Sequence, residues 1–323
     1  MALIRDFLVQ GAQMLLVVLL APLVTGAVRK MKARLTRRRG ASVFQPYRDL
    51  LRLIRKETVL AQNASWLFRT APYLIFAATW VAAALVPTFA TGLLFNWTAD
   101  LIAIVALLGS ARFFLALASM DVGTSFGGIG ASREVMIASL AEPAMIMIVF
   151  SLALLVGSTQ LSTIAAFMVS PDVGLRVTLG LALVSLVMVG IAENARIPVD
   201  NPATHLELTM VHEAMVLEYS GRHLALIELA SSLKLLLYLS MIACLFLPWG
   251  MVPMRPVLSA STVAAYVIGA GAYVLKLGFG CAALALFETA IAKMRVFRVP
   301  TFLGAALMLG FLGALLLFVS RGL

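Results

Sequence analysis

The chain has 323 residues, of which 62% are hydrophobic and 12% charged, and its mean hydropathy is +1.01. Soluble proteins carry about 25% charged residues, so this composition excludes an ordinary soluble domain and indicates an integral membrane protein. The formal net charge of +10 does not indicate nucleic-acid binding, because the basic residues gather in the loops of one side of the predicted bundle.

Apolar runs of about 20 residues, long enough to cross roughly 30 Å of hydrocarbon, predict an all-α protein with about eight transmembrane helices. We expect a single transmembrane domain over residues 1–323, with spans near 7–28, 72–94, 99–118, 135–157, 173–195, 224–247, 259–290 and 300–320. The seventh run is long enough to require tilt or an extension into water.

The segment between the first two spans is strongly basic, and only Asp49 and Glu57 oppose its many lysines and arginines. The positive-inside rule therefore predicts that this segment is cytoplasmic and that both termini face the outer side. Later loops on the same side are basic as well, at Arg133, Arg196, Arg222, Lys293, Arg295 and Arg298. This charge either sets topology and attracts anionic lipid headgroups, or it forms a docking surface for an acidic partner.

Residues 43–57, within the basic segment, have the pattern of an amphipathic helix lying on the membrane. Ser42 and Gln45 have the spacing of a capping box, and Pro46 falls in the first turn. The predicted apolar face consists of Phe44, Tyr47, Leu50, Leu51 and Ile54, and the predicted basic face of Arg48, Arg52, Arg55 and Lys56.

Ionisable residues inside the apolar runs are the strongest functional signal in the sequence. A charge in hydrocarbon costs several kcal/mol unless it is paired or hydrated, so such residues face the bundle interior and often mark ion pathways. The set comprises Arg112, Glu142, Glu193, Glu228, Lys234, Lys276 and Glu288. With the predicted topology, these residues are expected to form a polar funnel that opens toward the cytoplasm, with the two lysines either as switchable counter-charges or as members of static ion pairs.

An acidic cytoplasmic loop, residues 196–222, lies at the mouth of this funnel. It carries Asp200, Glu207, Glu213 and Glu218 together with His205 and His212. Neighbouring buried carboxylates raise one another's pKa, so this loop is a candidate site of proton exchange. The alternative is a solvated acidic loop that only balances Arg196 and Arg222.

No motif in the chain predicts a bound cofactor or metal. Cys244 and Cys281 have no CxxC partner, and the sequence HEAMV at 212–216 has Val216 where a zinc-protease helix requires its second histidine.

Three ordered motifs resemble a known family. The first, "ENARIPVDNPATHLELTMVHEAMVLEYSG", is similar to a signature of the quinone-module membrane subunit of respiratory complex I and of its homologues in membrane-bound group 4 [NiFe]-hydrogenases. It matches at Glu193, Asn194, Arg196, Pro198, Asp200, Glu207, Leu208, Glu218 and Tyr219. The second, "RRGASVFQPYRDLLRLIRKE", matches at Arg39, Gly40, Gln45, Pro46, Asp49, Leu53, Lys56 and Glu57.

The third motif, "ARFFLALASMDVGTSFGGIGASREVMIASLAEP", resembles the hydrogenase branch, namely the formate hydrogenlyase, hydrogenase-4 and CO-induced hydrogenase anchors. Its distinctive residues are Arg112 to Phe114, Asp121, Gly130 to Glu134, Glu142 and Pro143. The chain departs from complex I at Val199, Ala203 and His205, where complex I subunits carry carboxylates, and Gly40-Ala41 replaces a Gly-Pro pair.

The resemblance implies a non-catalytic subunit, in a prokaryotic cytoplasmic membrane, that anchors a hydrogenase module and couples its redox reaction to translocation of H⁺ or Na⁺. The expected partners are the hydrogenase large and small subunits, an iron–sulfur subunit, antiporter-like membrane subunits and the lipid bilayer, with the nickel–iron centre and iron–sulfur clusters held by partner subunits. The implied interface with the peripheral module comprises Arg39, Gln45, Asp49, Arg133, Glu134, Arg196, His205, His212 and Tyr219. Two alternatives remain open: a quinone-binding subunit of a complex I-like NADH:quinone oxidoreductase, and a self-contained ion transporter.

Overall fold

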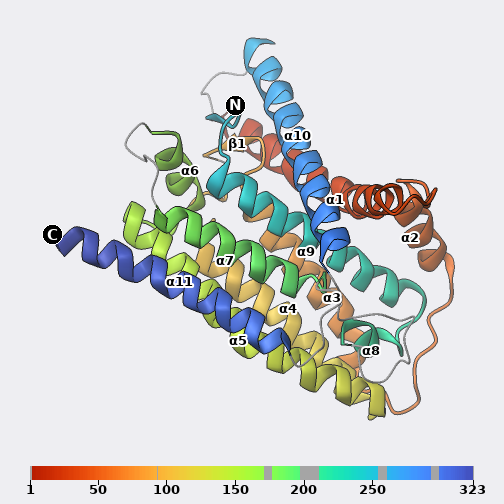
Figure 1. Ribbon diagram of the computed structural model, residues 1–323. Coiled ribbons are helices and arrows are strands. Elements are labelled where there is room, and N and C mark those ends of the chain that lie inside the picture. The colour runs from red at the N-terminus through yellow and green to blue at the C-terminus, as the bar shows by residue number, and fades with distance from the viewer. Residues whose placement is uncertain are drawn as a thin grey trace.

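The structure, a computed structural model, describes residues 2–92, 94–170, 177–196, 211–253, 260–291 and 298–322 (Figure 1). Within these ranges the helices are α1 Ala2–Leu35, α2 Gln45–Arg55, α3 Trp66–Leu85, α4 Leu101–Asp121, α5 Ser125–Val156, α6 Leu161–Val169, α7 Val177–Glu193, α8 His212–Val216, α9 Gly221–Phe246, α10 Ala260–Ala290 and α11 Val299–Gly322. Two short strands, β1 Ala90–Thr91 and β2 Val252–Pro253, pair in parallel.

Seven of the described helices, α1, α3, α4, α5, α9, α10 and α11, are long and apolar enough to cross a membrane. The span predicted at 173–195 corresponds to α7, an apolar helix of 17 residues that packs against α5 and α11. The prediction of an all-helical membrane protein is therefore confirmed. Both ends of the chain lie on the side of the molecule opposite to α2 and α8 (Figure 1).

Helix α5 begins at Ser125, ten residues before the predicted start of its apolar span. Thr124 caps the helix by accepting a hydrogen bond from the Gly127 amide, 3.3 Å away. A side chain at Gly127 would collide with the Ser119 carbonyl of α4, so this glycine permits the two helices to approach closely. The polar turn around Arg133 and Glu134 thus extends the helix beyond the hydrophobic run, which hydropathy alone does not predict.

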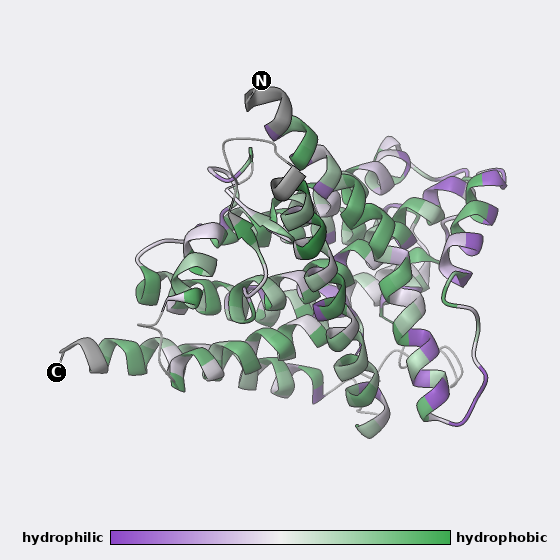
Figure 2. Cartoon of the chain, turned by 90° about the horizontal axis from the view of Figure 1, so that it is seen from above, coloured by the Kyte–Doolittle hydropathy of each residue, from purple (hydrophilic) through white to green (hydrophobic). Residues whose placement is uncertain are grey.

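Helix α2, Gln45–Arg55, confirms that a helix forms within the predicted range 43–57, but its predicted apolar face is only partly buried. Pro46 and Leu50 are buried, whereas Leu51 and Ile54 are exposed in this single chain. The predicted capping box does not form, since no side chain caps the helix and Ser42 instead accepts a hydrogen bond from the Phe44 amide. Hydrophilic residues gather at this end of the molecule, and most of the remaining helical surface is hydrophobic (Figure 2).

The main core lies where α1, α4, α5, α7, α9 and α11 meet, and a smaller core joins α3, α4, α8 and α9. Helix α10 packs mainly on α1 and α9. It crosses the other long helices at a steep angle (Figure 1). This divergence leaves a groove between α7, α9 and α10.

Candidate functional site

Arg112, near the middle of α4, is the centre of the largest charge network that the described residues form. Its side chain is 6% exposed and reaches three carboxylates. Nε lies 3.4 Å from Glu134 Oε1, and Nη1 lies 3.3 Å from Glu142 Oε1, both on α5. Nη2 pairs with Oε1 of Glu193 at the end of α7. The planar fork of the guanidinium allows one cation to bind carboxylates from two other helices.

Lys234 completes the network from α9. Its Nζ lies 2.8 Å from Oε2 of Glu193, whose side chain is only 2% exposed. Glu193 therefore sits between two cations, and four helices meet through five charged side chains. Each charge alone would be strongly unfavourable at this depth, so the network exists only because its members compensate one another.

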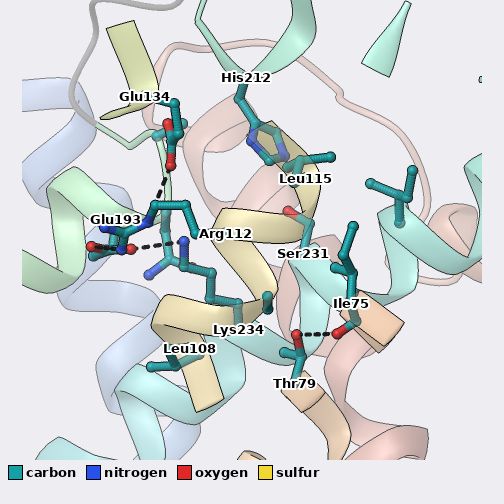
Figure 3. A pocket seen from close by; sticks show the side chains of 15 residues that line it. Ile75, Thr79, Leu108, Arg112, Leu115, Glu134, Glu193, His212, Ser231 and Lys234 are labelled. Carbon is teal, nitrogen blue, oxygen red and sulfur yellow. Dashed lines mark hydrogen bonds and ion pairs between the residues drawn. The ribbon is translucent and has the colours of Figure 1, made fainter. Parts of the chain in front are cut away.

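The network borders a small cavity of about 50 Å³, which is enough space for a few water molecules. Figure 3 shows Arg112, Glu134, Glu193 and Lys234 around one part of the cavity and His212 of α8 reaching toward it. Because the walls carry charged groups as well as apolar ones, water in this cavity would be hydrogen-bonded rather than isolated.

A second, more polar cavity of about 310 Å³ lies between α1, α2, α8 and α9. Its lining includes Asp49, Glu213 and Glu228. His212, Ile227 and Ser231 line both this cavity and the small one, so these side chains lie between them. The two cavities are therefore neighbours, and the small one reaches Glu193 while the larger one reaches the α2 and α8 end.

Glu142 links the network to the outside of the bundle. Its side chain is 44% exposed, although it lies near the middle of α5 and contacts buried Arg112. In the isolated chain this carboxylate faces the surface that lipid or a partner helix would cover.

Glu288 forms a separate cluster instead of joining the Arg112 network. Its carboxylate is 5% exposed and pairs with Lys32 of α1 at 2.8 Å and with Arg196 at 3.3 Å. Arg196 is positioned by the turn that ends α7, in which its amide donates to Ile191 and Ala195 adopts a positive φ of 50°. The single funnel predicted from the sequence is thus divided into two clusters.

Two residues predicted at the interface with a peripheral module, Glu134 and Tyr219, lie inside the protein. Glu134 faces Arg112, and Tyr219 is 4% exposed, stacks on Phe68 and donates a hydrogen bond to its carbonyl at 3.1 Å. Burial, together with nearby Asp121, raises the pKa of the Tyr219 phenol, which keeps it a hydrogen-bond donor at neutral pH.

The other predicted site residues divide between the surface and the polar cavity. Arg39, Glu213 and Glu218 are exposed, Arg133 is half-buried, and Gln45 donates a hydrogen bond to Asp49 at 3.0 Å. Asp200, His205 and Glu207 lie outside the described residues. Among the described residues no group of three or more His, Cys, Asp or Glu side chains is arranged to hold a metal ion.

Sequence reasoning included Arg112 among the intramembrane charges but did not identify it as the hub, and it assigned Glu134 to the surface. The signal for Glu134 was weak, because it adjoins Arg133 at the edge of a hydrophobic run. Only the early start of α5 brings it opposite Arg112.

The fold and this network define a multi-pass membrane protein with a buried network of ion pairs that joins four helices. The sequence matches the NADH dehydrogenase family over residues 9–319, and the chain belongs to this family. It is 33% identical over 308 residues to formate hydrogenlyase subunit 4 of Escherichia coli, covering 95% of this chain and 96% of the relative. It is also 36% identical over 243 residues to hydrogenase-4 component C of the same organism, covering 74% of this chain and 75% of that one.

More distant relatives include NADH-ubiquinone oxidoreductase chain 1 of Triticum aestivum, 28% identical over 242 residues, covering 71% of this chain and 73% of that one. A chain of the membrane-bound sulfane sulfur reductase, an archaeal respiratory membrane complex, has the same fold, with a TM-score of 0.78, 17% identity and coverage of 97% of this chain and 99% of that one. The resemblance predicted from the three motifs is therefore confirmed. The bacterial relatives point to the cytoplasmic membrane.

Proposed function

We propose that this chain is the membrane subunit of a multisubunit [NiFe]-hydrogenase complex of the formate hydrogenlyase or hydrogenase-4 type, and that it couples the redox reaction of a peripheral module to translocation of H⁺ or Na⁺. The near full-length similarity to formate hydrogenlyase subunit 4 supports the type of complex. The nickel–iron centre and iron–sulfur clusters would belong to partner subunits.

The observation that carries the coupling role is the bridge that Arg112 makes between buried and exposed carboxylates. Glu193 is 2% exposed and adjoins the small cavity, whereas Glu142 is 44% exposed on the side of the bundle. A shift of the guanidinium toward one carboxylate weakens its hold on the other. Protonation of Glu193 would therefore alter the environment of Glu142, which is the type of differential interaction that coupling requires.

The route begins in the polar cavity beside Asp49, Glu213 and Glu228, and passes His212 and Ser231 to the small cavity. Glu193 receives the ion there once Lys234 or Arg112 moves away from its carboxylate, and Glu142 delivers the effect to antiporter-like subunits beside the bundle. The peripheral module docks over the basic end near α2 and α8, where the predicted cytoplasmic charges lie. Both chain termini would then face the outer side of the membrane.

Hydrogen evolution from reduced methyl viologen tests the assignment to a hydrogenase complex. The complex is purified through this chain in mild detergent, and we expect hydrogenase activity to copurify with it. A complex that makes no hydrogen but reduces quinone from NADH would refute the hydrogenase assignment.

Glu142→Gln tests the coupling role. The substitution removes the exposed charge but keeps the size of the side chain, so we expect assembly and methyl viologen activity to persist while ion uptake by proteoliposomes falls severalfold. Glu57→Gln, at an exposed carboxylate outside the proposed ion path, is the matched control and should leave uptake unchanged. Wild-type uptake by the Glu142 variant would exclude the proposed exit.

Glu207 is a motif residue outside the described ranges. Glu207→Gln is predicted to lower ion uptake while assembly persists, as Glu142→Gln does.

A second candidate function is quinone binding in a complex I-like oxidoreductase. Several relatives are named for quinone oxidoreductases, and the cavity of about 310 Å³ has the volume of a small-molecule site, although its lining is more polar than that of most such sites. Quinone retained by the purified complex, with activity sensitive to quinone-site inhibitors, would support this candidate over the first.

A further inference from the structure

Lys276 is a deep cation that the Arg112 and Glu288 clusters leave unused. It lies on α10 and lines the groove between α7, α9 and α10, which has a volume of about 730 Å³ and mostly apolar walls. Among the described residues no carboxylate lies within ion-pairing distance of Lys276. The other cations of the bundle interior do have such partners: Arg112 and Lys234 with Glu193, and Arg196 with Glu288.

Lys276 is too far from either end of α10 to be an ordinary interfacial lysine. It lies 13 residues after Val263 and 14 before Ala290, the limits of the apolar segment of the helix. It also follows Gly269 by seven residues, about 10 Å of helix rise, and Gly269 adjoins the carbonyls of Phe89 and Gly250 in the outer loops. An ammonium at this depth requires a compensating negative group.

The groove is longer than one lipid leaflet is deep. On α7 its wall runs from Leu179 to Ile191, which is 12 residues or about 18 Å, and it continues to Trp249 at one end and Arg196 at the other. Half of the hydrocarbon core is about 15 Å. A phospholipid would keep its phosphate at the headgroup level and fill only part of this length, whereas a transmembrane helix would follow all of it.

The α10 wall of the groove is unusually open. Only 22% of the apolar window of α10 is buried in this chain, compared with 61% for α9. Its groove-facing residues, Lys276, Phe279, Gly280, Ala283 and Phe287, follow the spacing of one helix face. The small side chain of Ala283, which is exposed, leaves room for a close neighbour one to two turns from the lysine, whereas Gly280 packs against Leu239 of α9.

We propose that a transmembrane helix of a partner subunit lies in this groove and presents an aspartate or glutamate to Lys276. This inference rests on the proposed function only in requiring that the chain belong to a multisubunit membrane complex. Charge complementarity identifies the occupant, because an acidic side chain on a membrane helix is the group that brings negative charge to the depth of Lys276. The groove is distinct from the exit at Glu142, since α5 contributes no residue to its lining.

Photo-crosslinking in the intact complex tests what occupies the groove. A photoreactive amino acid replaces Ala283, which is exposed and lines the groove, and in a matched control it replaces Val274, which is nine residues earlier and so on the opposite face of α10. We expect Ala283 to crosslink a membrane-spanning peptide that contains an Asp or Glu, and Val274 not to crosslink that peptide. Crosslinks from Ala283 to phospholipid alone would overturn the proposal.

Charge variants test the role of Lys276. Lys276→Met is expected to weaken retention of the crosslinked membrane subunit roughly three- to thirtyfold, the range for one interhelical polar contact in a membrane, while Lys276→Arg retains it. Lys276→Asp should also weaken retention of this subunit. Replacement of the acidic residue identified by crosslinking with lysine should restore retention in the Lys276→Asp variant. Wild-type retention in Lys276→Met would refute the ion pair. Methyl viologen activity should persist in all variants, and its absence from the wild-type complex would count against the hydrogenase assignment rather than against the groove.

Discussion

Replacement of Arg112 by methionine is the most informative single perturbation of the charge network. The change keeps an unbranched side chain but leaves Glu134 and Glu193, with side chains 11% and 2% exposed, without their shared cation. Removal of one member of a buried ion pair costs about 3–5 kcal/mol because the remaining charge stays desolvated. Lys234 still compensates Glu193, so we expect the lower half of this range, about 3–4 kcal/mol.

Thermal unfolding of the detergent-solubilised protein measures this loss. Cys244 and Cys281 are both buried, so a thiol-reactive fluorescent dye reports unfolding without a new label. At about 2 °C per kcal/mol for a chain of this size, Arg112→Met should unfold about 6–8 °C below the wild type.

Two further variants separate charge from geometry. Arg112→Lys keeps the charge but cannot reach three carboxylates with separate nitrogens. Its unfolding temperature should therefore lie between those of the wild type and Arg112→Met. Addition of Glu134→Gln to Arg112→Met should restore part of the loss, because it removes one uncompensated carboxylate. An unfolding temperature for Arg112→Met equal to that of the wild type would show that the network contributes no net stability, and the reasoning would fail.

Three other substitutions probe positions that the structure makes critical. Gly221→Ala should destabilise the protein by about 1–3 kcal/mol, because Gly221 has a φ of +55° and a Cβ there would lie 2.6 Å from the Glu57 carbonyl oxygen; thermal unfolding measures it. Ala195→Gly should raise stability by about 0.5–1 kcal/mol, because Ala195 holds a left-handed conformation at the end of α7 that glycine adopts without cost; urea titration measures it. Glu288→Gln should loosen the contact between α1, α10 and Arg196, seen as faster hydrogen exchange at the adjoining helix ends.

Each of these substitutions has an internal control. Gly11→Ala adds a methyl group where nothing lies within 4 Å, so it should be neutral or slightly stabilising, and equal losses at Gly11 and Gly221 would contradict the steric argument. Glu218→Gln, at an exposed carboxylate, should not change hydrogen exchange, and a change equal to that of Glu288→Gln would show a general charge effect. A lower stability for Ala195→Gly would mean that the αL strain at this turn is compensated elsewhere.

The sequence predicted the class and most of the elements because membrane crossing imposes a strong local requirement. Each span must be a continuous apolar run, and basic loops indicate the cytoplasmic side of the membrane. Hydropathy and charge therefore located the spans and helix α2 without knowledge of packing. The same reasoning misplaced the start of α5, where the helix continues past the apolar run through a polar turn. That extension depends on a contact with α4 at Gly127 and a partner for Glu134, and neither is encoded locally.

The sequence by itself determined which ionisable residues must be compensated, because a charge in hydrocarbon is costly wherever the helix is placed. Only the tertiary structure decided how they are compensated. Arg112 and Lys234 both pair with Glu193, and Glu288 pairs with Lys32 and Arg196. Lys276 lines a groove. These choices depend on which faces four or more helices present to one another over distances of a few ångströms, and helix periodicity within one span carries no information about its neighbour's rotation.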